Sequence, residues 1–216
     1  MAQQSRYPAY NVMDEVSAWD DHTQSIVSAR LVREHGWRYL NDVEAEILRA
    51  ACSVIVDDLR SDIVDFVVGH IDDKLHADKG EGQRKAGVPP IRELLCGGLI
   101  ALDDVARTRC KLPFISLDDA SQLQLLEELA ASRLTPADAW DGSRLADTRV
   151  SGGDNSEVRA PIPQHDFFQK LLTLTVEAYY SHPKVWSELG YGGPAYPRGY
   201  VRTQLGQLDP WEAKPE

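Results

Sequence analysis

Apolar side chains recur at steps of three and four residues along most of this chain, the spacing that gathers them on one face of an α-helix. The clearest case opens at Asn41, an N-cap residue that Glu44 follows three positions later, as in a capping box. The same spacing recurs over residues 61–78, 91–107, 117–133 and 166–180, after an earlier helical segment that begins at Trp19. The sequence therefore predicts a mainly α fold, a compact helical bundle with long irregular loops.

Two of these helices carry further local predictions. The glycine pair at 97–98 is expected to interrupt the helix over 91–107, because glycines in mid-helix often mark the close approach of another backbone. Ser116 and Asp119 are the expected capping pair of the helix over 117–133. The side chains expected to face inward from that helix are Leu123, Leu126, Leu129 and Ala130.

Three segments lack a helical period. Residues 1–16 are predicted to form an extended N-terminal arm that Tyr7 and Tyr10 could anchor. Residues 135–163 are rich in Gly, Ser, Asp and Pro and are predicted to form a flexible surface loop. Residues 181–216 are predicted to form an extended tail. The length of the chain favours a single helical domain over residues 1–216, with these segments as appendages.

The tail has the composition of a docking segment. It places three tyrosines and two tryptophans between five glycines and five prolines, a pattern that suits neither a helix nor a regular strand. Large amphipathic aromatic side chains favour partial burial, against either the chain's own bundle or a partner. Tyr, Trp and Arg dominate protein interfaces, and the two arginines favour a partner. The predicted partner-binding residues are Tyr179, Tyr180, His182, Trp186, Tyr191, Tyr196, Arg198, Tyr200, Arg202 and Trp211.

Tyr180 and His182 mark the point where the last long helix meets the tail, which makes them the candidates for a position near a partner's active site. The favoured role for His182 is that of a cation, because a positive charge at the negative end of a helix stabilises the last carbonyl groups.

The composition argues against two classes of partner. Thirty-four acidic against twenty-three basic side chains give a formal charge of −11, which would repel phosphate backbones and anionic lipid headgroups. No run of eighteen apolar residues occurs, so direct membrane insertion is not expected either. Cys52, Cys96 and Cys110 are interpreted as small buried hydrophobic residues.

Motifs for catalysis are missing from the sequence. The glycines at 80–82 and 190–193 lack the flanking strand and helix of a dinucleotide-binding turn, and no Gly-x-Ser-x-Gly, Glu-x-x-His or Cys-x-x-Cys-His occurs. His70, Asp72 and Asp73 are interpreted as solvated charge at a helix end. No catalytic, cofactor-binding or metal-binding residues are therefore predicted. A self-sufficient helical metal-binding protein or enzyme is the competing hypothesis.

The residues from Phe167 through the tail carry a family resemblance. The element from Thr175 to Pro183 combines Thr, Glu, two aromatic residues, Ser and Pro, and it leads into the glycine-rich aromatic segment. This arrangement resembles the C-terminal signature of the gluconate 2-dehydrogenase subunit 3 family, apart from one inserted residue, Ala178. Similarity extends over most of residues 37–211, and its most distinctive part is the C-terminal one.

The resemblance implies an accessory role. Members of this family are small, non-catalytic subunits whose partner is a flavin-dependent dehydrogenase of the glucose-methanol-choline type, which oxidises sugars, sugar acids or glycosides. FAD is then expected to be bound by the partner and not by this chain. Whether a cytochrome subunit also belongs to the assembly is left open by the resemblance. The N-terminal residues 1–11 hold no secretory pattern, which predicts a cytoplasmic location. Export to the periplasm together with a partner is the alternative that the resemblance implies.

Overall fold

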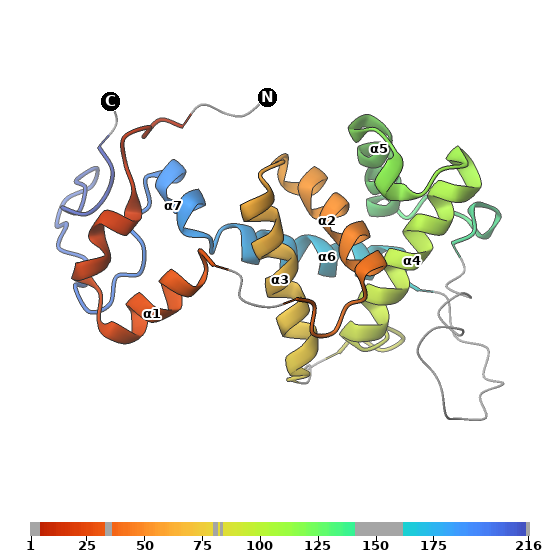
Figure 1. Cartoon of the computed structure of the whole chain (residues 1–216), viewed down its shortest axis with the longest axis horizontal. Helices are drawn as coiled ribbons and strands as arrows, with labels where there is room; N and C mark the ends of the chain where they lie inside the picture. The colour runs from red at the N-terminus through yellow and green to blue at the C-terminus, as the bar shows by residue number, and fades with distance from the viewer. Residues whose placement is uncertain (1–4, 33–35, 80–81, 83, 141–161, 215–216) are drawn as a thin grey trace.

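The computed structural model is mainly α, as predicted (Figure 1). It describes residues 5–32, 36–79, 82, 84–140 and 162–214. The elements in chain order are η1 (Val12–Ala18), α1 (Asp21–Ala29), α2 (Asp42–Val56), α3 (Ser61–Ala77), α4 (Ile91–Cys110), η2 (Phe114–Ser116), α5 (Asp119–Ala130), η3 (Pro136–Asp138), α6 (Gln164–Tyr179) and α7 (Pro183–Leu189). Most of the loop predicted over 135–163 lies outside the described residues.

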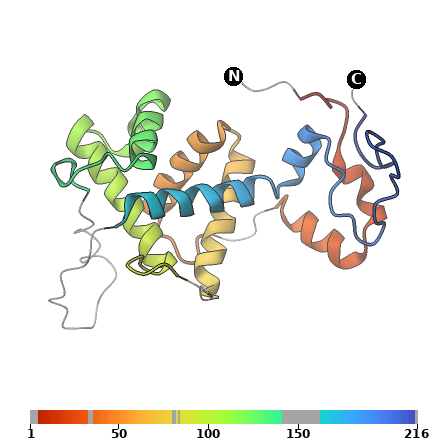
Figure 2. The same cartoon turned by 180° about the vertical axis from the view of Figure 1, so that it is seen from behind.

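Helix α6 is the centre of the larger hydrophobic core. It packs against α2, α3, α4 and α5, and it crosses the bundle in Figure 2. Its residues Phe167 and Leu171 are completely buried, as expected for a helix with apolar residues around most of its circumference. Full burial of one such side chain stabilises the fold by about 1.5–3 kcal/mol.

Helix α2 begins with the predicted capping box. The Asn41 side chain accepts a hydrogen bond from the Glu44 backbone N–H at 2.9 Å, and the Glu44 carboxylate accepts one from the Asn41 N–H at 3.0 Å. These two reciprocal bonds satisfy backbone donors that a helix start leaves without intrahelical partners. The predicted start of α2 is therefore confirmed.

Asp72 is buried inside α3, so its interpretation as solvated charge is wrong. Its carboxylate accepts hydrogen bonds from the backbone N–H groups of Arg38, Tyr39 and Leu40, at 2.7, 3.0 and 2.8 Å. Three backbone donors compensate the cost of burying a carboxylate. Asp72 thereby fixes residues 38–40, which lead into α2, against the C-terminal half of α3.

Helix α4 runs without a break through its two glycines, which corrects the predicted interruption. The close neighbour of Gly98 is the ring of Phe167 on α6, and not another backbone. A Cβ atom built on Gly98 would lie only 2.2 Å from that ring. Gly98 therefore lets α4 and α6 pack ring against backbone, which explains why a weak helix former stands at this position.

Replacing Gly98 by alanine is expected to lower the free energy of unfolding by about 1–3 kcal/mol, because the new methyl group overlaps the buried Phe167 ring. In a chain of this length the melting temperature should fall by about 2–4 °C for each kcal/mol. Gly36→Ala is the control, since no atom of the described residues lies within 4 Å of its Cβ position. Equal melting temperatures for both variants would contradict the proposed packing.

Helix α5 differs from its prediction at both its start and its inner face. The N-cap is Asp118, whose side chain accepts from the Ser121 N–H at 2.9 Å, and Ser116 belongs instead to η2. Leu123 is exposed, whereas Leu125 is buried with Leu126 and Leu129. The buried face includes Gln122 in place of Leu123, because the Gln122 side chain donates a buried hydrogen bond to the Phe114 carbonyl at 2.9 Å.

Cysteine burial was predicted correctly for two of three residues. Cys52 and Cys96 are buried in the larger core, and Cys110 is exposed at the last turn of α4. The Cys52 sulfur lies 3.2 Å from the Thr175 hydroxyl of α6, and burial raises the pKa of its thiol to about 12. Cys52 therefore packs as a neutral thiol.

The two ends of the chain form a second, smaller lobe beside the bundle (Figures 1 and 2). A separate hydrophobic cluster holds it together, made of Val12, Trp19, Val27 and Trp186. We call the described residues 5–30 and 181–214 the terminal lobe. The extended N-terminal arm predicted over 1–16 is wrong from Val12 onward, where η1 begins with Asn11 as its side-chain cap. Described residues 5–11 hold no helix and include a turn closed by the Tyr10 N–H and the Tyr7 carbonyl at 3.1 Å.

The tail contains a helix, α7, that its composition did not predict. Pro183 stands at the first position of α7, where a missing N–H costs nothing, and Gly190 ends the helix in the left-handed conformation at φ 70°. The expectation of a wholly irregular tail is therefore wrong between Pro183 and Leu189. The same proline and glycine that indicated irregular backbone are the signals that start and stop this helix.

Candidate partner-binding site

The aromatic residues of the tail fall into a buried set and an exposed set. Trp186 is buried against Trp19 and Val27, and Trp211 is half-buried. Tyr191, Tyr196 and Tyr200 are exposed, the last two by 69% and 65%. One part of the tail therefore packs against its own chain, while another part offers aromatic rings to solvent.

Glycines bring the buried aromatic rings close to the tail backbone. A Cβ atom on Gly190 would lie 2.6 Å from the Tyr7 ring, and one on Gly192 would lie 2.6 Å from the Trp211 ring. At Gly193, where φ is +78°, it would lie 2.5 Å from the Trp19 ring. The three glycines thus serve aromatic packing, and two of the rings come from the N-terminal segment.

Arg198 fastens the tail between two tryptophans. Its guanidinium lies 5.6 Å from the Trp19 ring centroid and 4.5 Å from that of Trp211, and it donates a hydrogen bond to the Gly192 carbonyl. Its Nε and Nη1 atoms are buried without hydrogen-bond partners among the described residues. Cation–π attraction, worth about 0.5–2 kcal/mol per ring, therefore acts together with this one hydrogen bond to hold the side chain.

Asp209 organises the last turn of the tail. Its buried carboxylate accepts hydrogen bonds from the Val201 and Arg202 N–H groups, both at 2.8 Å. Its own N–H donates to the Glu212 carboxylate at 2.8 Å. These bonds close residues 201–212 into a fixed loop.

The exposed residues of this loop and its neighbours form what we call the tail surface, namely Tyr191, Tyr196, Tyr200, Val201, Leu205 and Leu208. Arg202 extends over the Tyr200 ring at 5.5 Å and lies 3.4 Å from the Glu212 carboxylate. Aromatic and aliphatic side chains in solvent beside an arginine match the composition of interface hot spots. Four of the ten predicted partner-binding residues belong to this group, counting Arg202 with the three tyrosines.

His182 does not play the cationic role that its sequence position suggested. It is buried, its ring packs edge-on against Phe66 at 5.0 Å, and its Nδ1 accepts a hydrogen bond from the Lys184 N–H at 3.2 Å. Burial lowers the pKa of His182 to about 4, so the ring is neutral at pH 7. His182 caps the start of α7 and does not cap the end of α6.

Acidification from pH 6.5 to pH 4 should destabilise the chain through His182. The unfolded histidine, with a pKa near 6.5, binds a proton in this range, while the folded one stays mostly neutral until the pH approaches its pKa of about 4, so stability falls as the pH falls. We expect a loss of about 1–2 kcal/mol from this residue. His182→Asn can keep the cap without titrating, and its urea unfolding should lose less stability over this range than that of the wild type. Parallel losses in both proteins would contradict the assignment.

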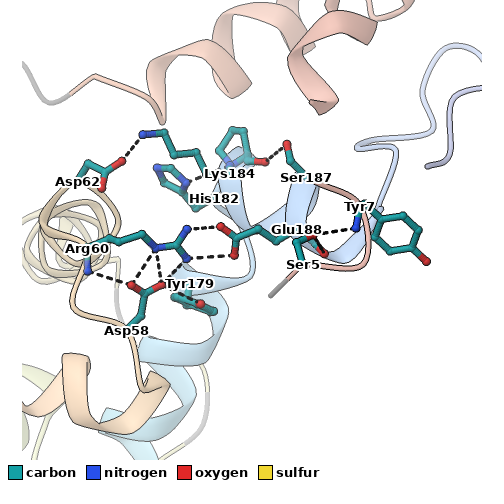
Figure 3. Close-up of polar contacts among 11 residues, drawn as sticks. Ser5, Tyr7, Asp58, Arg60, Asp62, Tyr179, His182, Lys184, Ser187 and Glu188 are labelled. Atoms are coloured by element: carbon teal, nitrogen blue, oxygen red, sulfur yellow. Dashed lines mark hydrogen bonds and ion pairs between the residues drawn. The ribbon is translucent and has the colours of Figure 1, made fainter. Parts of the chain in front are cut away.

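Tyr179 belongs to the junction between the terminal lobe and the bundle (Figure 3). Its hydroxyl donates a hydrogen bond to the Asp58 carboxylate at 3.0 Å, and burial, reinforced by that bond, raises its pKa to about 12. Arg60 connects Asp58, at 2.6 Å from its Nη2, to Glu188 of α7, at 3.0 Å. Lys184 forms a second ion pair with Asp62 (Figure 3). Tyr180, next in sequence, is 52% exposed beside this junction.

The described residues meet the requirements of neither a metal site nor a membrane-spanning helix. Among them no three His, Cys, Asp or Glu side chains gather where they could hold a metal ion. Within that same part of the chain, no helix has the length and apolar character needed to cross a membrane.

Sequence reasoning missed the residues that support the tail surface. Trp19 was assigned to a helix and Asp209 was given no role, yet both hold the tail in place. Tyr7 and Tyr10 were correctly expected to anchor the N-terminal segment, and the Tyr10 hydroxyl donates to the Trp211 carbonyl at 2.8 Å. The spacing of Asp209 and Glu212, three residues apart, was a usable signal for a local cap.

Comparison with known proteins identifies one family. The family model described as gluconate 2-dehydrogenase subunit 3 matches residues 42–193, which is more than half of the chain. No curated protein and no solved structure matches the chain significantly. The matched range begins with α2 and ends at Gly193, and so it includes the bundle, the junction and α7. The chain belongs to the gluconate 2-dehydrogenase subunit 3 family.

Proposed function

We propose that this chain is a non-catalytic small subunit that binds and stabilises the catalytic subunit of a flavin-dependent sugar or glycoside dehydrogenase. Family membership supports a place in such an oxidoreductase complex. In this proposal the partner is a flavoprotein of the glucose-methanol-choline type, and the FAD belongs to that partner.

The tail surface is the observation that carries the proposal. Tyr196 and Tyr200 are exposed on the segment that Arg198 holds against Trp211 and that leads into the loop closed by Asp209. A preorganised loop loses little conformational entropy on binding, which leaves more of the contact energy for affinity. Exposed aromatic side chains on such a loop are typical of protein interfaces.

If this chain binds the folded state of the flavoprotein and not its unfolded state, binding stabilises the flavoprotein by mass action. When the small subunit exceeds its dissociation constant by a few hundredfold, the partner gains about 3–4 kcal/mol of folding free energy. The flavoprotein should then keep its flavin at temperatures at which it loses the flavin on its own.

Coexpression tests the proposal. The chain is produced with and without the flavoprotein encoded by the neighbouring reading frame, and flavin release is followed by fluorescence during heating. We expect the flavoprotein to copurify with the chain and to release its flavin at a higher temperature in the complex. Unchanged flavin release, or turnover by the isolated chain, would contradict the proposal.

A further inference from the structure

A hollow opens in the terminal lobe where the two ends of the chain meet. Its volume is about 280 Å³, and its lining comes from the N-terminal segment on one side and from residues 210–214 on the other. This is just below the roughly 300–1,000 Å³ of small-molecule pockets, and it suits one long side chain better than a cofactor. No residue of the tail surface lines it.

Aromatic rings and carboxylates dominate the walls of this hollow. Tyr7, Tyr10 and Trp211 contribute rings, and Glu15 and Glu212 contribute carboxylates, with Lys214 as the one basic residue among the described residues of the lining. Rings attract cations through their negative faces, and carboxylates attract them by charge. The walls therefore favour a positively charged guest.

The two carboxylates differ in their availability. Glu212 is already engaged by the Asp209 N–H and by Arg202. Glu15, half-buried at the wall, interacts with the Arg198 charge at longer range, but no described side chain forms a hydrogen bond or a close ion pair with it. Lys214 is exposed, and its flexible stem lets its ammonium group turn into solvent. Glu15 is thus the group that can pair with an incoming cation.

We propose that this hollow receives an arginine side chain of the catalytic subunit, held by the Glu15 carboxylate between the aromatic rings. A guanidinium is planar, stacks on aromatic rings and pairs with a carboxylate through two parallel hydrogen bonds, which an ammonium group cannot do. The terminal lobe already stacks Arg198 on Trp211, so its rings are suited to this cation. This inference rests on the proposed function and adds a second contact to the tail surface.

A titration of the full chain with N-acetylarginine amide tests the site without the partner. We expect saturable shifts of the Trp211 indole N–H in NMR spectra, and none with the neutral isostere N-acetylcitrulline amide. Glu15→Gln should weaken the binding of N-acetylarginine amide about fivefold. Asp14→Asn makes the same change in charge at an exposed neighbour outside the hollow and should leave binding unchanged. Equal shifts with both compounds, or equal binding by both variants, would overturn the inference.

Binding of the chain and its variants to the flavoprotein distinguishes a failure of this inference from a failure of the proposed function. If the wild-type chain binds the flavoprotein and Glu15→Gln binds it about fivefold more weakly than Asp14→Asn does, both stand. If the two variants bind it equally well, the arginine site is wrong while the proposed function survives. If the wild-type chain does not bind the flavoprotein, the proposed function fails, and the titration still decides whether the hollow takes a guanidinium group.

Discussion

Replacing Tyr196 and Tyr200 together by alanine is expected to weaken binding of the flavoprotein by about 100-fold or more. If truncation of each interface tyrosine costs about 1.4 kcal/mol, the two together cost about 2.7 kcal/mol, which corresponds to about 100-fold in the dissociation constant. Both side chains are mostly exposed in the isolated chain, so its melting temperature should hardly change. Isothermal titration of the purified flavoprotein with each chain measures the effect.

The matched control removes exposed apolar side chains from the bundle. Val43 is 65% exposed and Leu59 is 80% exposed, and neither belongs to the terminal lobe. The Val43→Ala, Leu59→Ala double variant should bind the flavoprotein as the wild type does. If this control loses affinity while the tyrosine variant keeps it, the partner docks on the bundle and the tail surface has another role.

Gly193→Ala should disrupt the terminal lobe while leaving the bundle folded. Alanine at φ +78° costs about 1–2 kcal/mol, and its methyl group would also overlap the Trp19 ring, which adds about 1–3 kcal/mol. The lobe has its own small hydrophobic cluster, so it should open locally. Amide hydrogen exchange should speed up in residues 190–214 and stay slow in α6, and affinity for the flavoprotein should fall with it.

Gly199→Ala separates the two causes. Gly199 has a similar φ of +71°, but in the part of the chain that the structure describes nothing lies within 4 Å of its Cβ position. This variant therefore carries the backbone strain without the overlap, and its hydrogen exchange should increase much less. Equal exchange in the two variants would show that ring packing on Gly193 does not hold the lobe together.

Helices with local signals were predictable from the sequence. The capping box at Asn41 fixed the start of α2, and the apolar period of α3 and α6 gave their extents to within two residues. The uninterrupted α4 was not predictable in the same way, because the reason for Gly98 lies on α6. A glycine that accommodates a ring and a glycine that breaks a helix look the same in sequence.

The candidate site could be predicted only in part, because its shape depends on the opposite end of the chain. Composition predicted an interface role for the whole tail, and it grouped Trp186 and His182, which are buried, with the exposed tyrosines. Their burial follows from contacts with Trp19 and Phe66, which are far away in sequence. Which rings remain exposed is therefore a tertiary property. The function of the tail surface stays a prediction.

A pull-down of the tagged full chain from its native host, followed by an absorbance spectrum, tests the central claim most directly. The proposed function predicts that a flavoprotein copurifies, that the complex shows the absorption bands of oxidised flavin, and that this flavin stays with the partner when the two chains are separated. A chain that purifies alone, or that itself retains the flavin after separation, would contradict it.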